Sequence, residues 1–172
     1  MSNFFKNSDL DNIKAESIVS DTLNNCDDGE LYLENSKSES ILLDDNKIKN
    51  SSYSSDLGYG FRAITGEVVA YSHSNDISKD SILKSSENLK DTLKSKKGTY
   101  NHEIPKSNKK YYEDLNPIEE KSQNSKIKIL NEVNNYIRSK GDMVSQVTAS
   151  FLGEHKEIEI IPALLNIFNE IL

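Results

Sequence analysis

The sequence predicts an α+β fold, in which an antiparallel sheet has about three helices packed on it. Apolar residues recur with a helical period near residues 9–25, 78–95 and 117–140. Between Glu30 and Ser74 they instead alternate with polar residues, as half-buried strands do. The chain has 172 residues, a length typical of one domain.

The first predicted helix spans roughly residues 9–25. Its small or apolar residues fall on one helical face: Ala15, Ile18, Val19, Thr22 and Cys26. Cys26 is the single cysteine, which excludes an internal disulfide, a zinc ribbon and a redox CxxC motif. No histidine is near it in the sequence to activate the thiol, so we expect an inert, buried side chain.

Several short strands are predicted to follow. Leu31 and Leu33 alternate with polar residues, and further apolar runs lie at residues 41–43, 57–64 and 68–71. Asp44-Asp45-Asn46 and Thr65-Gly66 separate these runs and are typical turn sequences. This pattern favours an antiparallel meander of short strands with tight turns.

The second predicted helix, near residues 78–95, can cover one face of that sheet. Ser78 is its expected N-cap, Asp80 lies in its first turn, and its apolar stripe contains Ile82, Ser86, Leu89 and Leu93. Residues 96–116 are rich in Lys, Asn, Ser and Gly without a period. We expect them to form a flexible polar connection.

The third predicted helix spans residues 117–140, with Asn116 as N-cap and Pro117 at its first position. Its expected buried stripe is Ile127, Leu130 and Ile137. Alternating residues at 147–151 and 158–160 predict two more strands. Because Gly153 interrupts them, we expect a hairpin.

Composition and charge exclude two classes of partner. The net charge is −7, from 21 Lys and Arg against 28 Asp and Glu, and no arginine-rich run is present. Such a surface repels phosphate, so we expect no nucleic-acid binding. The N-terminus lacks the pattern of a signal peptide, and no apolar run approaches the ~18–20 residues that cross a bilayer. We therefore expect a cytoplasmic protein without membrane contact.

One motif resembles a dinucleotide-binding fingerprint. Residues 58–63 read GYGFRA and match GxGxxA, and Asp80 follows at about the spacing of a ribose-binding acid. That fingerprint requires a buried strand before it and a helix at its end, whereas residues 51–56 are polar and residues 61–71 are strand-like. We expect instead that Gly58 and Gly60 allow close approach of another backbone or a large side chain.

No other residues form a recognisable reactive site. His73, His102 and His155 are too far apart in the sequence for a local metal pair. The acidic pairs 27–28, 44–45 and 119–120 are adjacent residues, which point apart more often than they share a proton. We therefore assign no catalytic, cofactor-binding or metal-binding residue.

Arg62 is the one charge within the most apolar strand region. We expect it to pair with Glu67 or with a carboxylate of the following helix. Ligand binding is the alternative role.

Four segments resemble the N-terminal region of the TldD/PmbA metalloprotease family. They are SILLDDNKIK at residues 40–49, GYGFRAITGE at 58–67, YSHSNDIS at 71–78, and VSQVTASFLGE at 144–154. The similarity spans about residues 10–161 and is closer to the TldD branch. It assigns residues 1–161 to the family's N-terminal domain and residues 162–172 to a divergent tail, as expected of a truncated or split gene product.

The resemblance implies a function that this chain does not complete. Such proteases carry their zinc site, an HExxxH helix with a cysteine ligand, in a C-terminal part, and this sequence contains no HExxxH. The family implies cleavage of peptides or unfolded proteins in the bacterial cytosol by paired TldD-like and PmbA-like (TldE-like) subunits. This chain would supply cleft and subunit contacts, with zinc bound elsewhere.

Two alternatives remain open at this point. The chain is an interaction module that pairs with a separately encoded catalytic half or a PmbA-like partner, or it is a non-functional remnant of a split gene. Whichever of these readings holds, the edge of the Glu30–Ser74 sheet, with its Ser-rich rim at Ser51–Ser55, is the expected docking surface for an extended peptide or another domain.

Overall fold

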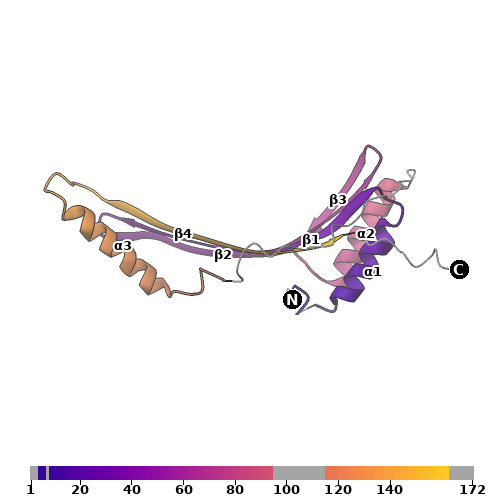
Figure 1. Ribbon diagram of the computed structural model, residues 1–172, viewed down its shortest axis with the longest axis horizontal. Helices are drawn as coiled ribbons and strands as arrows, with labels where there is room; N and C mark the ends of the chain where they lie inside the picture. The colour runs from indigo at the N-terminus through magenta and orange to yellow at the C-terminus, as the bar shows by residue number, and fades with distance from the viewer. Residues whose placement is uncertain (1–3, 7, 95–114, 163–172) are drawn as a thin grey trace. The chain divides into compact units, whose positions relative to one another are not determined.

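The computed structural model describes residues 4–6, 8–94 and 115–162 of the chain. Its elements are α1 (Asn12–Leu23), β1 (Asp28–Asp44), β2 (Lys47–Thr65), β3 (Val68–Ser74), α2 (Lys79–Leu93), α3 (Gln123–Arg138) and β4 (Thr148–Pro162) (Figure 1). The sheet has the order β3-β2-β1-β4. The predicted α+β class with an antiparallel sheet and helices is therefore confirmed.

The turns were predicted correctly, but the strand lengths were not. Asp45 and Asn46 both have positive φ, 48° and 66°, and Gly66 has φ 59°, as tight hairpin turns require. However, β1 has 17 residues and β2 has 19, so the expected series of short strands is wrong. The polar residues 51–56 belong to β2, because main-chain bonds to β1 hold them extended without an apolar face.

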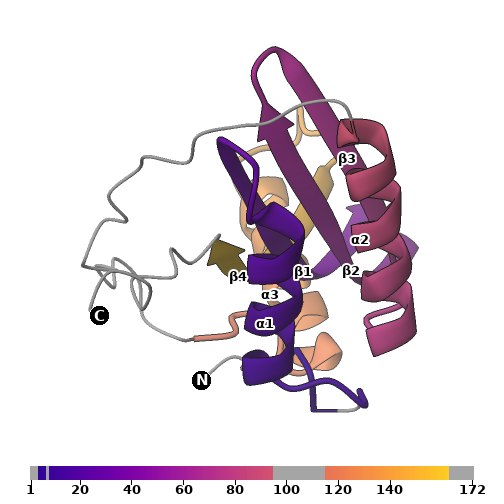
Figure 2. The ribbon, with the colours of Figure 1, turned by 90° about the vertical axis from the view of Figure 1, so that its right-hand side faces the viewer.

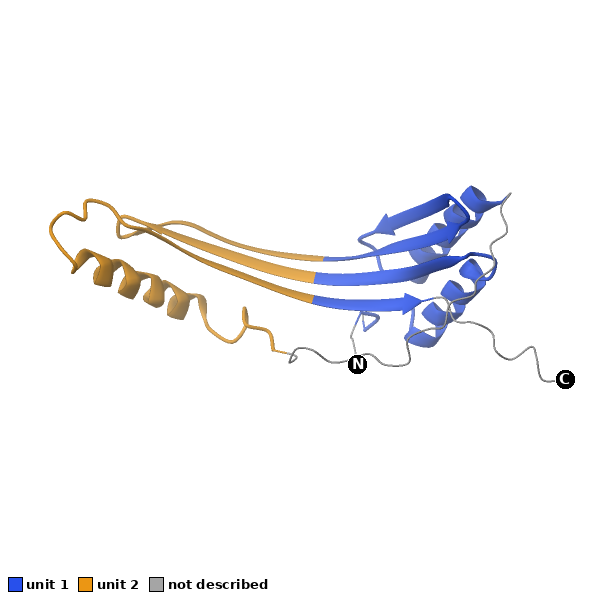
Figure 3. Cartoon of the chain, turned by 45° about the horizontal axis from the view of Figure 1, so that its top comes forward, with its two compact units in different colours: residues 1–35, 57–109, 157–172 blue, residues 36–56, 110–156 orange. Residues whose placement is uncertain are grey.

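The described residues divide into two compact units. Of the described residues, unit 1 comprises 4–6, 8–35, 57–94 and 157–162, and unit 2 comprises 36–56 and 115–156 (Figure 3). β1, β2 and β4 each contribute residues to both units. Each unit has its own cluster of buried apolar residues.

In unit 1, α1 and α2 lie side by side on one face of the sheet (Figure 2). Both helices begin as capped helices should, because Asp11 accepts from the Lys14 N–H and Ser78 accepts from the Ser81 N–H. The predicted N-cap Ser78 is therefore confirmed. The buried residues beneath the helices include Leu31, Leu33, Phe61, Ala63, Ile82 and Leu89.

Cys26 belongs to this core, as expected. Its thiol is buried and donates a long hydrogen bond of 3.9 Å to the Thr22 carbonyl oxygen. Burial raises the pKa of the Cys26 thiol above its ordinary value. Because the thiolate is the reactive form, this environment makes the side chain inert.

The glycines of the GxGxxA sequence lie within β2, where no helix follows them. A Cβ on Gly60 would stand 2.6 Å from the hydroxyl of Tyr71, whose ring covers this position. A Cβ on Gly58 would stand 3.0 Å from the carbonyl oxygen of Ser74. The expectation that these glycines admit a side chain and a backbone is confirmed.

In unit 2, Leu130 of α3 packs with Ile41 and Leu43 of β1, and Ala149 and Phe151 of β4 pack against this cluster. The helix begins after Ser122, which accepts from the Ser125 N–H, so the predicted start at Pro117 is wrong. Asn116 instead accepts from Ile118 and Glu119 in a single turn. The turn does not propagate because the Ile118 carbonyl oxygen accepts from the Lys126 side chain rather than from a helical N–H.

The predicted hairpin after α3 is also wrong, because β4 is one strand of 15 residues. It runs antiparallel to β1, with Thr148 beside Asp44 and Glu157 beside Asn35. Gly153 does not interrupt it. A Cβ there would only reach ordinary contact, 3.4 Å from Glu39 and Ile118 atoms, so the strand continues along its neighbour.

Two sequence predictions fall outside the described residues. They are the flexible connection at residues 96–116, of which 96–114 are not described, and the divergent tail at 162–172, of which 163–172 are not described. The assignment of residues 1–161 to one family domain likewise remains a prediction.

Candidate functional site

The first half of β2 has an open edge. β3 pairs with β2 only from Tyr59 to Thr65, while β1 lies on the other side of β2 along the sheet. Within the described parts of the chain, residues 47–57 therefore have no strand neighbour on their outer side. An unpaired edge presents a row of main-chain N–H and C=O groups that can pair with another extended chain. This is the region, around Ser51–Ser55, that the sequence predicted as a docking surface.

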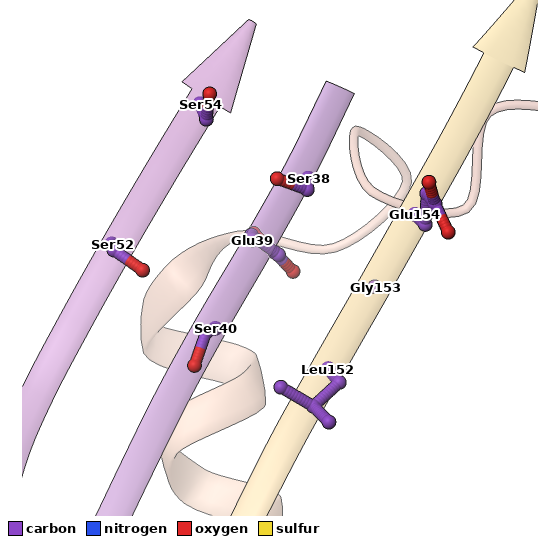
Figure 4. Close-up of a pocket in the computed structure, with 8 residues that line it drawn as sticks. All are labelled: Ser38, Glu39, Ser40, Ser52, Ser54, Leu152, Gly153 and Glu154. Atoms are coloured by element: carbon purple, nitrogen blue, oxygen red, sulfur yellow. The ribbon is translucent and has the colours of Figure 1, made fainter. Parts of the chain in front are cut away.

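Beside this edge lies an open depression of about 500 Å³. We call it the serine face, since Ser38 and Ser40 of β1 and Ser52 and Ser54 of β2 line it, with Glu39 of β1 and with Leu152, Gly153 and Glu154 of β4 (Figure 4). Side chains alternate between the two faces of a strand. These serines therefore lie opposite α3, while Ser51 faces α3 and accepts from Gln123 at 2.7 Å.

Hydroxyl groups dominate the serine face, and the carboxylate of Glu154 lies among its lining residues. Hydroxyl groups both donate and accept hydrogen bonds, so they can satisfy main-chain groups of a bound chain without selecting one sequence. The small side chains also leave room for larger side chains of a ligand. The arrangement fits recognition of an extended peptide better than it fits bond-breaking chemistry.

On the other face of this sheet, a buried ion pair supports the depression. Lys126 of α3 is only 2% exposed and pairs with Glu39, which alternates with Ser38 and Ser40. Its ammonium also donates to the Ile118 carbonyl oxygen at 2.6 Å and lies 5.5 Å from the centre of the Phe151 ring. The pair fixes β1 against α3 directly beneath the serines.

The sequence pattern alone does not reveal this pair, because a lysine on a helix is usually exposed. The buried residues of α3 are Lys126, Leu130 and Asn134, spaced four residues apart. Asn134 donates to Asn46 in the β1–β2 turn at 2.6 Å. The expected stripe is correct for Leu130, and partly buried Ile127 packs against the same cluster, whereas Ile137 is 37% exposed. The sequence does contain one signal of their burial, because Lys126 and Asn134 each lie four residues from Leu130 and therefore share its face of the helix.

Arg62 pairs with neither of its expected partners. Its guanidinium donates to both oxygens of Glu30, at 2.8 and 2.6 Å, and to Asp28 at 3.1 Å. Both carboxylates belong to β1, the neighbouring strand, because cross-strand neighbours are closer than residues of the next turn or helix. The hydrogen bond with Glu30 raises the pKa of Arg62. Because the guanidinium of Arg62 already binds two carboxylates of β1, these contacts support a structural role for Arg62.

Tyr32 lies on the same face of β1 as Glu30, and its raised pKa can be tested by titration. Its hydroxyl donates to Glu34 at 2.5 Å, which is the main reason that its pKa rises from 10.0 to about 12. The folded state holds this proton more tightly than the unfolded chain. Its contribution to stability is therefore full below pH 10 and is lost as the pH rises from 10 to about 12.

Glu34→Ala should return the pKa of Tyr32 toward its ordinary value of 10.0, because the accepting carboxylate is removed. The ring resonances of Tyr32, followed by NMR between pH 8 and about 12, measure the shift. Glu67→Ala removes an exposed carboxylate from the β2–β3 turn and should leave Tyr32 unchanged. An unchanged titration in Glu34→Ala would contradict the assignment.

The histidines lie apart from one another in the fold where they are described. His73 of β3 stacks on Tyr71 with ring centres 5.7 Å apart, while His155 is half-buried in β4. His102 lies outside the described residues. In the described ranges, no group of three or more His, Cys, Asp or Glu side chains could hold a metal ion. The donor set there does not fit a zinc site.

The adjacent acidic pairs are divided among different partners. Asp28 contacts Arg62, Asp44 accepts from Gln146 and Thr148, Asp45 pairs with Arg138, and Glu119 pairs with Lys37. The hydrogen bonds from Gln146 and Thr148 lower the pKa of Asp44, and the hydrogen bond from Lys37 lowers the pKa of Glu119. These carboxylates act as structural acceptors. Over the described residues, no helix is long and apolar enough to span a membrane.

Comparison with known proteins gives a consistent picture. The family model described as PmbA/TldA metallopeptidase domain 1 matches residues 29–95. A protein named "Metalloprotease TldD homolog" from Buchnera aphidicola (subspecies Acyrthosiphon pisum) is 31% identical over 146 residues, covering 84% of this chain and 30% of that protein. The Haemophilus influenzae protein of the same name is 29% identical over 143 residues, covering 80% and 29%. The chain thus spans about 30% of the length of these relatives.

Solved structures share the fold. TldE from Thermococcus kodakarensis has a TM-score of 0.59 and 14% identity, with coverage of 85% of this chain and 34% of that one. A putative modulator of DNA gyrase from Bacteroides thetaiotaomicron has a TM-score of 0.55 and 15% identity, with coverage of 86% and 39%. In both cases the match extends over most of the chain described above.

Proposed function

Because residues 29–95 belong to the first domain of the PmbA/TldA metallopeptidase family, we propose that this chain is the non-catalytic N-terminal portion of a TldD-like zinc metalloprotease. The enzyme would cleave peptides or unfolded proteins in the bacterial cytoplasm. The similarity to proteins named as TldD homologues over more than 80% of the chain supports this assignment. The catalytic zinc would be held by residues outside this chain, since the sequence contains no HExxxH motif.

The role of this portion is to hold an extended segment of the substrate. The carrying observation is the open edge of β2 over residues 47–57. A peptide that adds to this edge gains main-chain hydrogen bonds, which do not depend on its sequence. The adjacent serines 52 and 54 would accommodate its side chains. A protease that acts on unfolded chains requires this kind of sequence-tolerant contact.

The role in pairing with a TldE-like or TldD-like subunit is a second part of the proposal. The fold shared with TldE supports it, because related chains with a common fold can associate through equivalent surfaces. The substrate edge and the subunit contacts are separable, since the first requires only β2 residues.

Hydrogen exchange tests the substrate edge. Adding oxidised insulin B chain, an unfolded peptide, to the purified chain should slow amide exchange in residues 47–57. Exchange in α1 and α2 should not change. Because N–H groups of adjacent strand residues point to opposite edges, one of Tyr53→Pro and Ser54→Pro removes an outward N–H, and the other removes a bond to β1. The proline variant that lacks the outward N–H should abolish the slowing of amide exchange by the peptide. Its midpoint of thermal unfolding should stay close to that of the unaltered chain.

Two results would overturn this proposal. One is the absence of protection in residues 47–57 at saturating peptide, and the other is protection that neither proline variant alters. Zinc-dependent, chelator-sensitive hydrolysis by the chain alone would separately contradict the non-catalytic role.

A further inference from the structure

The serine face lies within unit 2 and brings a carboxylate, hydroxyl groups and an apolar side chain together. The antiparallel register of β4 with β1 places Ser38 opposite Glu154 (Figure 4). Two residues earlier in β4, Leu152 lies opposite Ser40. The Cβ atoms of opposite residues are about 4.5–5.5 Å apart. The Ser38 hydroxyl and the Glu154 carboxylate can therefore contact the same group of a ligand.

The depression at the serine face has acidic side chains in its lining. Among the described residues that line it, Glu39 and Glu154 carry charge, and none is a lysine or an arginine. The Glu39 carboxylate already pairs with Lys126 on the α3 side of the sheet. The Glu154 side chain, by contrast, is 61% exposed. Glu154 is therefore the group of this depression that attracts a cation from solution.

The chain itself shows that Glu154 accepts an ammonium group. The Nζ atom of Lys156 lies 3.2 Å from Oε1 of Glu154, and both side chains are exposed. Exposed ion pairs are weak, and a carboxylate has two accepting oxygens. A second ammonium can therefore share the carboxylate with Lys156 or displace it.

Leu152 offers a surface for the alkyl part of such a ligand. It is 74% exposed, and alternation along β4 places it on the same face as Glu154. Residues two apart in a strand are separated by about 6.7 Å, which is similar to the reach of the four-carbon stem of lysine. Long charged side chains lay such a stem on apolar surface and keep the charged end in a polar environment.

We propose that the serine face binds a lysine side chain of an unfolded substrate segment, with the ammonium between Glu154 and Ser38 and the stem on Leu152. This assignment rests on the proposed role of the chain in holding substrate, but it does not require pairing at the edge of β2. The other serines of the face can hydrogen-bond the main chain on either side of the lysine.

Lysine fits this arrangement better than arginine. An ammonium is compact and has three donors that can turn toward a carboxylate and separate hydroxyls. A guanidinium is a rigid planar fork, which suits two oxygens of one carboxylate or phosphate. In the serine face the acceptors come from two strands, and one oxygen of Glu154 already faces Lys156.

Two peptides test the ammonium. Each carries one lysine between glycine and serine residues and is acetylated and amidated at its ends; the lysine nitrogen is free in one peptide and acetylated in the other. In NMR titrations of the full chain, the peptide with free lysine should shift the amide signals of Ser38, Leu152 and Glu154. It should bind about fivefold more tightly than the acetyllysine peptide.

A free diamine tests whether the lysine belongs to a polypeptide segment. Cadaverine presents the same ammonium and alkyl chain without main-chain groups for the serines. It should therefore bind more weakly than the peptide with free lysine. Equal or tighter binding of cadaverine would overturn the assignment to a substrate segment.

Substitutions with opposite effects test the residues. Glu154→Gln should weaken binding of the lysine peptide by about fivefold. Lys156→Met should strengthen it by a similar factor, because it removes the competing ammonium, and a folding defect cannot produce such a gain. Glu132→Gln and Lys128→Met are the matched controls, since they make the same charge changes in an exposed pair of α3. Both controls should leave binding unchanged.

The proposal is wrong if the free and acetylated lysines bind equally, or if neither Glu154→Gln nor Lys156→Met alters the affinity. Its failure is distinguishable from that of the β2 edge. Protection of residues 47–57 by insulin B chain without a preference for free lysine would disprove the lysine site alone. Binding of the lysine peptide at Glu154 without that protection would disprove the β2 edge alone.

Discussion

Glu39→Ala is expected to lower the free energy of unfolding by about 3–5 kcal/mol, because it leaves the Lys126 charge buried without its partner. Lys126 is 2% exposed and Glu39 is 11% exposed, so water cannot replace the lost carboxylate. The remaining contacts, to the Ile118 carbonyl and the Phe151 ring, do not neutralise an ammonium. Urea unfolding followed by circular dichroism measures the change.

A double variant separates the charge from the packing. Lys126→Met with Glu39→Leu removes both charges and keeps the volume, and it should recover most of the loss, since apolar pairs of similar size replace buried ion pairs without large penalty. Glu119→Ala is the control in the same unit, because it breaks the exposed pair with Lys37. It should cause no measurable change. A small effect of Glu39→Ala would show that the pair is hydrated.

Phe61→Ala is expected to destabilise unit 1 by about 3–5 kcal/mol, since it removes the largest fully buried side chain of that core. The loss combines transfer of the ring to water with the cavity left between the sheet and the two helices. Amide exchange in α1 and α2 should accelerate accordingly. Thermal unfolding gives the matching decrease in midpoint.

Val69→Ala provides the comparison for Phe61. Val69 lies opposite Ile64 in the β2–β3 ladder and is 59% exposed, so its truncation should change stability by less than about 0.5 kcal/mol. Equal effects of the two substitutions would show that the face beneath α1 and α2 is not the core of unit 1.

Local chemistry explains which parts of the fold the sequence predicts. The turn at Asp45-Asn46 and the cap at Ser78 depend on residues close in sequence, and both are confirmed. β4 and the start of α3 depend on distant groups. β1 keeps β4 extended past Gly153, and Lys126 takes the Ile118 carbonyl that a longer helix would have used. The hydrophobic periodicity of a short stretch of sequence reveals neither the pairing of β1 with β4 nor the hydrogen bond from Lys126 to Ile118.

The candidate site shows the same division. Residues Ser51–Ser55 stood out as a polar segment beside apolar strands, and that segment is the open edge of β2. The partners of Arg62 were wrongly predicted because pairing of β1 with β2 brings Asp28 and Glu30 beside it. The ion pair of Lys126 with Glu39 was not predicted, since its partners come from two distant segments.

The sheet order has a consequence for the folding of the chain during synthesis. β1 and β2 are joined by a two-residue turn and can pair as soon as both have left the ribosome. β4 must return from far away, since Asp44 and Thr148 are 104 residues apart. The outer side of β1 therefore remains unpaired until β4 (Thr148–Pro162) has also been made. During this interval β1 is the nascent-chain edge most exposed to misassembly and to chaperone capture.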